Sequence, residues 1–255
     1  MDRANEVKIK ICGLKRACDV RLCGRLGVDI AGLVVEYPLP VPWNLTADEA
    51  RLLIAEVRAP MRSCIVTGGT RDKILTLAKA LNPDYVQLHY RETLTDTEYI
   101  ARELLDLQIG VIKTLPLSPD ERLTQFGTDD IAKCTELLNR AGIYAILVDA
   151  RSPSNAADTA GARGRRVSEG GPASEGRCAA VDSGLYRQIR EHARKPVILA
   201  GGITPANIPG VLSSARPDII DMMTGVEDSP GVKNEAKLAR VMGALGRAAS
   251  SAALL

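Results

Sequence analysis

The sequence predicts an α/β fold: one (β/α)8 TIM barrel that spans residues 1–255 as a single domain. Eight short apolar runs alternate with segments of helical periodicity, which is the number and order of elements in such a barrel. The last two of these runs are followed by glycine loops, at the place where barrels of this size form a phosphate site. The competing prediction, an open doubly wound sheet, favours a glycine-rich loop after the first strand instead.

The expected strands are short and bounded by turn residues. Uninterrupted apolar runs of this kind are typical of parallel strands that are covered on both faces. In chain order, the expected strands are residues 8–12, 30–35, 64–67, 85–89, 110–113, 145–149, 197–200 and 219–222.

Local patterns also indicate where helices begin. Apolar side chains four residues apart predict a helix within residues 14–26. Thr46 with Glu49, and Thr95 with Glu98, each fit a capping box. Further helices are expected at residues 71–81, 130–141, 185–193, 206–212 and 235–248.

Residues 151–177 interrupt this rhythm. They contain five arginines, several glycine and proline turns, and Val167 as their one large apolar side chain. Such a segment buries too little apolar surface to offset its ordering entropy. We therefore expect a mobile insertion in the sixth strand-to-helix loop, with a functional lid over the catalytic face as the alternative.

Composition bounds the classes of partner. Hydrophobic residues make up 45% and charged residues 25% of the chain, as in ordinary globular proteins. The net charge of +2 with interspersed signs and the 3% of aromatic residues do not favour nucleic acid. No apolar run reaches the length of a membrane-spanning helix, and no signal segment precedes residue 8. A cytoplasmic protein with a small-molecule partner is expected, as a monomer or a homodimer.

Six cysteines are scattered along the chain without a Cys-x-x-Cys pair. No histidine lies close to any of them in sequence, so neither a zinc site nor a disulfide framework is indicated. We expect most of them to be small core residues.

The late glycine loops suggest an anion site. Gly201 and Gly202 follow one expected strand, and Thr204 is placed to cap a helix that starts at Pro205. Gly225 lies in the loop that follows the next strand. Strand, glycine and helix start together bring backbone amides close to a phosphate, although a tight turn without a ligand gives the same pattern.

Polar residues at strand ends are the candidate catalytic groups of a parallel barrel. Cys12 and Asp149 share a parity that can point both side chains into the barrel mouth, as base and acid. Lys10 is a nearby positive charge that can lower the thiol pKa, and a buried structural thiol is the alternative. The polar strand-end residues are Cys12, Glu36, Gln87, His89, Lys113, Asp149 and Asp221.

Five motifs, in this order, closely resemble the phosphoribosylanthranilate isomerase family. The resemblance runs from about residue 8 to residue 247, interrupted by the insertion. The motifs are Lys10-Ile11-Cys12-Gly13-Leu14, Val86-Gln87-Leu88-His89, Leu147-Val148-Asp149, Ala200-Gly201-Gly202-Ile203-Thr204-Pro205-Ala206-Asn207, and Gly225-Val226-Glu227 with Pro230-Gly231-Val232-Lys233.

The resemblance implies an Amadori rearrangement in tryptophan biosynthesis, without a cofactor. It implies that Asp149 protonates the ribose ring oxygen and that Cys12 removes the C2' proton of the opened Schiff base. Backbone amides at four positions would hold the phosphate, and Asp221 would contact ribose hydroxyls. Those four positions are Gly201, Gly202, Gly225 and Val226.

The chain departs from the family at the aromatic end of the substrate. The family usually carries Ser-Pro-Arg after the second strand, whose arginine binds the anthranilate carboxylate, whereas residues 37–44 contain no arginine. Arg91 is a candidate replacement, and Trp43 or Tyr90 can stack on an aromatic ring. An isomerase of another phosphorylated amino-sugar and a non-catalytic phosphosugar-binding barrel therefore stay open as alternatives.

Overall fold

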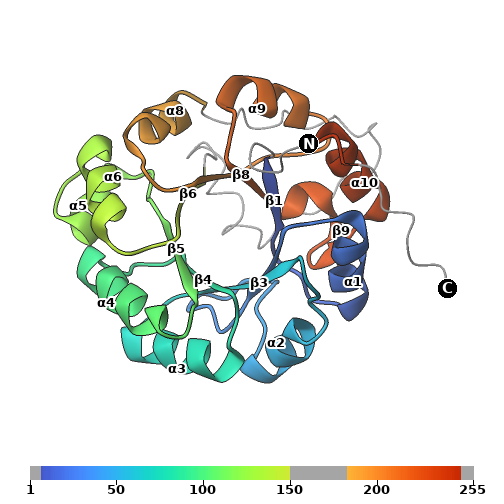
Figure 1. Cartoon of the computed structure of the whole chain (residues 1–255), viewed down its shortest axis with the longest axis horizontal. Coiled ribbons are helices and arrows are strands. Elements are labelled where there is room, and N and C mark those ends of the chain that lie inside the picture. The colour runs from blue at the N-terminus through green and yellow to red at the C-terminus, as the bar shows by residue number, and fades with distance from the viewer. Residues whose placement is uncertain (1–6, 150–182, 248–255) are drawn as a thin grey trace, which may run out of the picture.

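The computed structural model describes residues 7–149 and 183–247. Within them, eight parallel strands close into a barrel in sequence order, and β8 pairs with β1. Figure 1 shows the helices as an outer ring around these strands. The predicted barrel is confirmed, whereas the insertion predicted at residues 151–177 lies outside the described residues.

The strands lie close to their predicted positions. The last three agree with the prediction at both ends, and β3 begins two residues earlier than expected, at Arg62. The barrel strands are β1 (Lys8–Ile11), β2 (Ile30–Val34), β3 (Arg62–Thr67), β4 (Tyr85–Leu88), β5 (Gly110–Thr114), β6 (Ala145–Asp149), β7 (Val197–Ala200) and β8 (Ile219–Met222).

The helices follow the strands, and α5 was not predicted. Its sequence carries few large apolar residues, although Ser118 caps it and Pro119 stands in its first turn. The helices are α1 (Ala17–Leu26), α2 (Ala47–Ile54), α3 (Arg71–Leu81), α4 (Leu94–Leu105), α5 (Pro119–Phe126), α6 (Ile131–Arg140), α8 (Ser183–His192), α9 (Ile208–Ala215) and α10 (Glu235–Ala244).

Of the three helix caps predicted from the sequence, one is confirmed and two are wrong. The Thr46–Glu49 capping box is present, with hydrogen bonds in both directions. The box predicted at Thr95 is absent, because Thr93 caps α4 two residues earlier and accepts from the Asp96 amide at 3.1 Å. Thr93 fits the N-cap preference equally well, and its own backbone is extended, as is typical of an N-cap residue.

The helix expected to start at Pro205 begins three residues later, at Ile208. Asn207 Oδ1 accepts from the Thr204 amide at 2.8 Å, which closes a turn before the helix. Thr204 therefore caps this turn, and Asn207 stands at the N-cap of α9.

Strand alternation divides the core into two layers. Ile9 and Ile11 face the helices with the other residues of the larger apolar cluster. Lys10, between them, faces the barrel interior, where the filling side chains are mostly aliphatic. These interior residues are Ile30, Cys64, Ile112, Ala145, Leu147, Ile198, Ala200 and Ile219.

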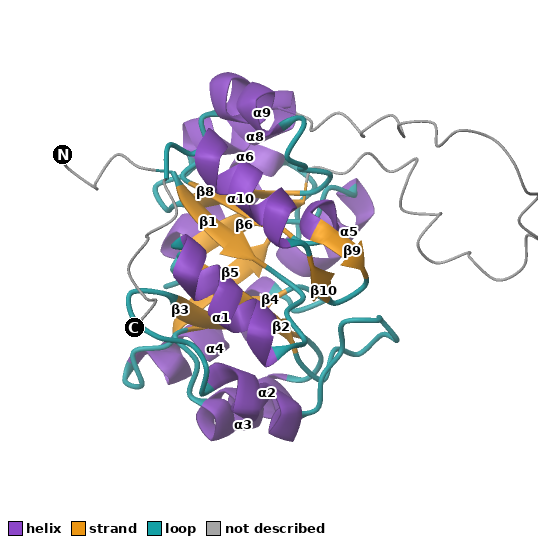
Figure 2. Cartoon of the chain, turned by 90° about the vertical axis from the view of Figure 1, so that its right-hand side faces the viewer, coloured by secondary structure: helices purple, strands orange, loops and turns teal. Residues whose placement is uncertain are grey.

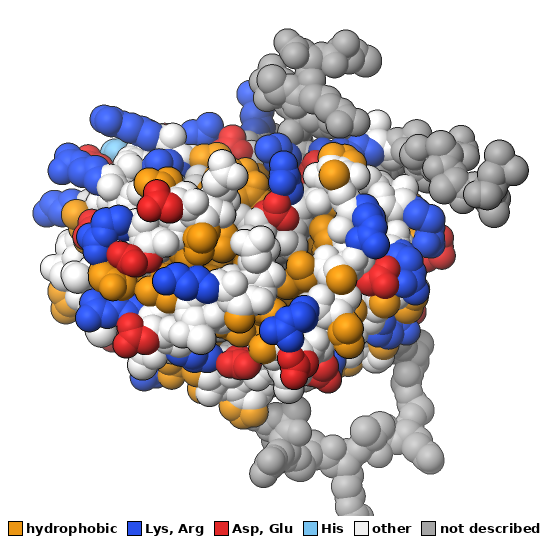
Figure 3. Space-filling view, turned by 60° about the horizontal axis from the view of Figure 1, so that its bottom comes forward, with side chains coloured by type: hydrophobic (Ala, Val, Ile, Leu, Met, Phe, Trp, Pro, Cys, Tyr) orange, Lys and Arg blue, Asp and Glu red, His pale blue; other side chains and the backbone are white. Residues whose placement is uncertain are grey.

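The short antiparallel strands β9 (Glu227–Ser229) and β10 (Val232–Lys233) form a separate hairpin beside the barrel (Figure 2). A 3-10 turn, η3 (Thr224–Val226), connects β8 to β9. In the described part of the chain, no helix has the length and apolar character to cross a bilayer. Figure 3 shows side chains of both charge signs interspersed over one face of the molecule.

A buried polar cluster lies under the loops that follow β3, β4 and β5. Lys113 and Glu92 are fully buried, with Nζ and Oε2 3.6 Å apart, and Lys113 also donates to Gln125 at 2.9 Å. Glu92 accepts from the amides of Gly69 and Tyr90, both at 3.1 Å. Lys113 faces outward rather than into the mouth, so it is not one of the catalytic groups suggested for strand ends.

Stability should depend on the protonation of Lys113. Burial lowers the pKa of Lys113 to about 8, although Glu92 opposes the shift. The unfolded chain therefore binds this proton more tightly between about pH 8 and 10.5. We expect the unfolding free energy, relative to a Lys113→Met/Glu92→Gln variant, to rise in this window by up to about 1.4 kcal/mol per pH unit. Urea titrations at several pH values measure it, and a flat or falling difference would contradict the shift.

Candidate active site

The centre of the site is a buried ion pair inside the barrel. Lys10 and Asp221 are partners in the β1–β8 register, and Lys10 Nζ donates to Asp221 Oδ2 at 2.8 Å. Their side chains are 0% and 8% exposed. Among the described residues, buried Asp221 Oδ1 has no hydrogen-bond partner. That oxygen is an acceptor ready for a hydroxyl group of a ligand.

Cys12 follows β1 directly and lies on the same side as Lys10. A β-carbon at Gly32 would come within 3.0 Å of Cys12 Cα, 3.2 Å of its Sγ and 3.2 Å of Lys10 Cε. Because Gly32 on β2 has no side chain, it leaves the space that the side chains of Cys12 and Lys10 occupy. Cys12 is 6% exposed, so its thiol is a buried group that still borders the mouth.

Opposing electrostatic effects act on the thiol. Burial raises the pKa of Cys12, and the charge of Asp221 adds to the rise, whereas Lys10 and Lys233 oppose it. Burial acts to lower the pKa of Lys10, but the charge and hydrogen bond of Asp221, together with the charges of Cys12 and Cys64, outweigh burial, and the net shift is upward. The ammonium therefore stays protonated beside a thiol that resists ionisation.

Asp149 ends β6 and is half-buried on the inner side of the barrel. The pKa of Asp221 is raised, mainly by burial. Lys10 opposes this rise, and the nearby charge of Asp149 adds to it. Asp221 is thus an electrostatic neighbour of both Cys12 and Asp149. The structure brings the two predicted proton-transfer residues to the same mouth.

Gln87 and His89 point to the interior from β4 and the residue just after it. His89 Nδ1 lies 3.1 Å from Gln87 Nε2 and 2.9 Å from Thr114 Oγ1. The Gln87 amide nitrogen is a donor, so Nδ1 accepts from it in this arrangement. Gln87 Oε1 is buried without a partner in the described part of the chain.

The two predicted glycine loops touch each other. Gly201 and Gly202 adopt positive φ values of 95° and 65°. A β-carbon on Gly225 would lie 2.0 Å from the carbonyl oxygen of Ile203, closer than any side chain can approach. Asn207 closes the first loop, because its Nδ2 donates to the Gly202 carbonyl at 2.9 Å. Residues after β7 and β8 therefore form one continuous backbone surface.

Apolar side chains gather at the ends of the first three strands. Cys12, Val34 and Val66 form a small buried cluster at the ends of β1 to β3. The partly buried residues packed against this cluster are Tyr37, Val41, Trp43 and Met223.

Arg91 stands further out from this cluster. Tyr37 meets the ring of Tyr90 edge-on, with centroids 6.0 Å apart. The exposed Arg91 lies over the Tyr90 ring, its guanidinium carbon 5.4 Å from the centroid. Its role as a carboxylate ligand stays a prediction.

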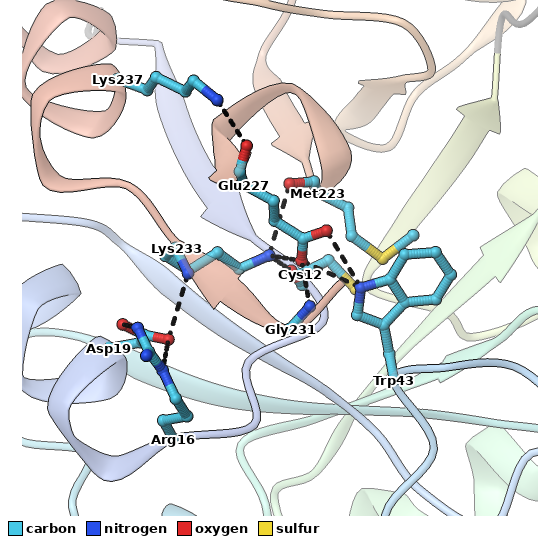
Figure 4. Close-up of polar contacts among 9 residues, drawn as sticks. All are labelled: Cys12, Arg16, Asp19, Trp43, Met223, Glu227, Gly231, Lys233 and Lys237. Carbon is cyan, nitrogen blue, oxygen red and sulfur yellow. Dashed lines mark hydrogen bonds and ion pairs between the residues drawn. The ribbon is translucent and has the colours of Figure 1, made fainter. Parts of the chain in front are cut away.

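Glu227 and Lys233 are site residues that the sequence analysis did not identify. Lys233 Nζ donates to Glu227 Oε1 and to the Cys12 carbonyl, both at 2.6 Å (Figure 4). Their motif, with Pro230-Gly231-Val232-Lys233, was visible in the sequence. The signal that reveals their role is their depth of burial, 8% and 4% exposed, which only the fold shows.

The family model for N-(5'phosphoribosyl)anthranilate (PRA) isomerase matches residues 9–244 of the chain. An N-(5'-phosphoribosyl)anthranilate isomerase of Methanosarcina acetivorans is 28% identical over 237 residues, which cover 91% of this chain and 90% of that protein. One of Halobacterium salinarum is 27% identical, covering 90% of this chain and 91% of that protein.

Solved structures show the same fold. The phosphoribosyl anthranilate isomerase of Thermotoga maritima has a TM-score of 0.70 at 24% identity, covering 94% of this chain and 98% of that chain. The enzyme of Thermus thermophilus has a TM-score of 0.68 at 24% identity, with the same coverage.

The pH dependence of alkylation should report the raised pKa of the Cys12 thiol. In a Cys18→Ser/Cys178→Ser background, the rate of iodoacetamide labelling at Cys12 should rise about tenfold per pH unit to a midpoint above 8.5. Lys10→Met should move the midpoint further upward, because the ammonium opposes the effect of burial. Peptide mass spectrometry quantifies the labelling. A midpoint at or below 8.5, or one that falls in the variant, would contradict this electrostatic account.

Proposed function

This chain belongs to the N-(5'-phosphoribosyl)anthranilate isomerase family, and we propose that Asp149 and Cys12 perform the acid and base steps of its reaction. The reaction is the Amadori rearrangement of N-(5-phosphoribosyl)anthranilate to 1-(2-carboxyphenylamino)-1-deoxyribulose 5-phosphate, in tryptophan biosynthesis. One observation carries the residue assignment: a thiol and a carboxyl group lie at one barrel mouth, with Asp221 as their common electrostatic neighbour.

The first proposed step opens the ribose ring. Asp149 donates a proton to the ring oxygen as the bond between that oxygen and C1' breaks. The lone pair of the anthranilate nitrogen forms the C1'=N bond of a Schiff base. Asp149 is left as a carboxylate, and the sugar gains a free hydroxyl group.

The second proposed step moves a proton from carbon. The Cys12 thiolate takes the proton from C2', and the C–H electrons form C1'=C2' while the C1'=N electrons return to nitrogen. The resulting enolamine then tautomerises to the aminoketone. Lys10 and Lys233 favour the thiolate over what burial alone would permit. These steps use only proton transfers, so no cofactor is part of the proposal.

The glycine loops after β7 and β8 are proposed to bind the phosphate. Gly201, Gly202, Gly225 and Val226 would do so through main-chain amides, which suit an anion and require no side chain. Asp221 Oδ1 would accept from a ribose hydroxyl. The contact of Gly225 with the Ile203 carbonyl supports this proposal, because it makes the two loops one surface.

The remaining proposed substrate contacts come from β4 and the residues that follow it. Gln87 and His89 face the interior between Cys12 and Asp149 around the barrel, and Arg91 stands at the rim beside Tyr90.

We further propose a single-domain cytoplasmic enzyme that acts on a small phosphosugar as a monomer or homodimer.

Removal of either proton-transfer group should lower turnover. We expect Cys12→Ser and Asp149→Asn each to reduce kcat by about two or more orders of magnitude, as the loss of a general base or acid does. Steady-state assays with N-(5-phosphoribosyl)anthranilate measure the effect. Cys18→Ser is the matched control, because Cys18 is exposed and lies outside the mouth.

Near-wild-type turnover in either variant would remove that residue from its role. Complementation of a tryptophan auxotroph that lacks the isomerase tests the activity itself. Failure of the wild-type chain to complement, together with retained binding of ribose 5-phosphate, would favour a different aglycone.

The phosphate site should be sensitive to one methyl group. Gly225→Ala forces the two loops apart, so we expect at least about a tenfold loss of affinity for ribose 5-phosphate in calorimetry. Gly210→Ala is the control, because a β-carbon there meets nothing within 4 Å. Unchanged binding by Gly225→Ala, or equal loss in both variants, would contradict the assignment.

A further inference from the structure

Trp43 is turned into the barrel mouth beside the catalytic cysteine. A β-carbon on Gly13 would lie 2.7 Å from Trp43 Cδ1 and 2.9 Å from Met223 Sδ. The indole therefore lies against the main chain of the residue that follows Cys12, with Met223 next to it (Figure 4). Gly13, with a φ of 70°, leaves the space that the ring occupies.

The polar edge of the indole is already occupied. Trp43 Nε1 donates to both carboxylate oxygens of Glu227, at 3.0 and 3.2 Å. Glu227 Oε1 also accepts from the Gly231 amide at 3.1 Å and from Lys233 Nζ. What remains of the indole for a ligand is its apolar surface.

One ammonium group connects this wall to the cysteine. Lys233 Nζ binds Glu227, the Cys12 carbonyl and, at 3.4 Å, the Met223 carbonyl. Both charged groups are buried, and such a pair is stable only when its remaining donors and acceptors are satisfied. Here each of them has several partners, so the positions of Trp43 and Cys12 are tied to the same buried pair.

The loop that carries Trp43 is also fixed at other points. Lys15 Nζ donates to the Pro42 carbonyl at 2.9 Å. The Tyr37 amide donates to Asn44 Oδ1 at 2.8 Å, and the Asn44 amide group donates back to the Tyr37 carbonyl at 3.2 Å. Trp43 is thus presented by an anchored loop as a preformed surface.

We propose that Trp43 is a specificity-determining residue, whose indole is the wall against which the aromatic ring of the substrate packs, and that the Glu227–Lys233 pair positions this wall relative to Cys12. The inference rests on the proposed function. In the substrate only C1' and one nitrogen separate the aromatic ring from C2', where Cys12 acts. The ring must therefore lie close to Cys12, and the side chains there are those of the apolar cluster around Trp43.

The proposal predicts a graded effect on KM. Trp43→Leu should raise KM for N-(5-phosphoribosyl)anthranilate about tenfold with a smaller change in kcat, because apolar packing against the ring involves none of the bonds that change and is similar in the ground and transition states. Trp43→Phe, which keeps an aromatic ring, should fall between Leu and the wild type. The inhibition constant of inorganic phosphate should stay unchanged in both variants.

The positioning role has its own readout. Trp43 is the only tryptophan of the chain, so tryptophan emission reports its surroundings directly. Glu227→Gln should shift the emission maximum and raise KM. Asp228→Asn, a change at the exposed neighbouring carboxylate, should do neither.

The experiments distinguish failure of the proposed function from failure of the roles of Trp43 and of the Glu227–Lys233 pair. A wild-type chain without turnover of N-(5-phosphoribosyl)anthranilate overturns the proposed function. A wild-type chain that is active, with a KM for Trp43→Leu within twofold of its own, overturns the role of Trp43. A Glu227→Gln variant with unchanged emission and KM overturns the positioning role.

Discussion

The ion pair between Lys10 and Asp221 is the constraint on which the mouth of this barrel depends. It places two charges in an interior filled mostly by aliphatic side chains, where removal of one partner would leave a buried charge uncompensated. Gly32 provides the space for Lys10, and the pairing leaves Asp221 Oδ1 without a hydrogen-bond partner among the described residues. The pKa values of Cys12 and Asp221 both respond to this pair, so fold and chemistry share one interaction.

The segment from Asp221 to Glu227 contributes to several parts of the mouth. Asp221 faces the interior, Met223 joins the apolar wall, Gly225 touches the loop after β7, and Glu227 holds Trp43. Asp221 lies in β8, and the chain then passes through the 3-10 turn η3 before it reaches Glu227 in β9, so successive residues meet different parts of the mouth. The proposed ribose, aglycone and phosphate contacts therefore depend on the path of a single segment. A distortion at Gly225 would reach all of them.

The sequence was sufficient for the barrel and for the ends of its strands, because buried parallel strands are short apolar runs and the glycine loops after them are distinctive. It was insufficient where the decisive contact is distant. Trp43 and Glu227 are far apart along the chain, and no local pattern indicates that they share a hydrogen bond. Lys113 was misassigned for a related reason: its position at a strand end is visible in sequence, but its outward direction depends on the strand's parity in the closed barrel.

In the proposed mechanism, the environment of Cys12 balances two requirements of a base that acts on carbon. Burial raises the pKa of the thiol, which lowers the fraction of thiolate but makes each thiolate a stronger base. A strong base is useful because a C–H proton is only weakly acidic, even beside a Schiff base. Lys10 and Lys233 limit this rise in the pKa of Cys12. Lys10 lies beside the Cys12 side chain, and Lys233 donates a hydrogen bond to the Cys12 carbonyl. The two lysines thus retain enough thiolate for catalysis without giving up the basicity that burial provides.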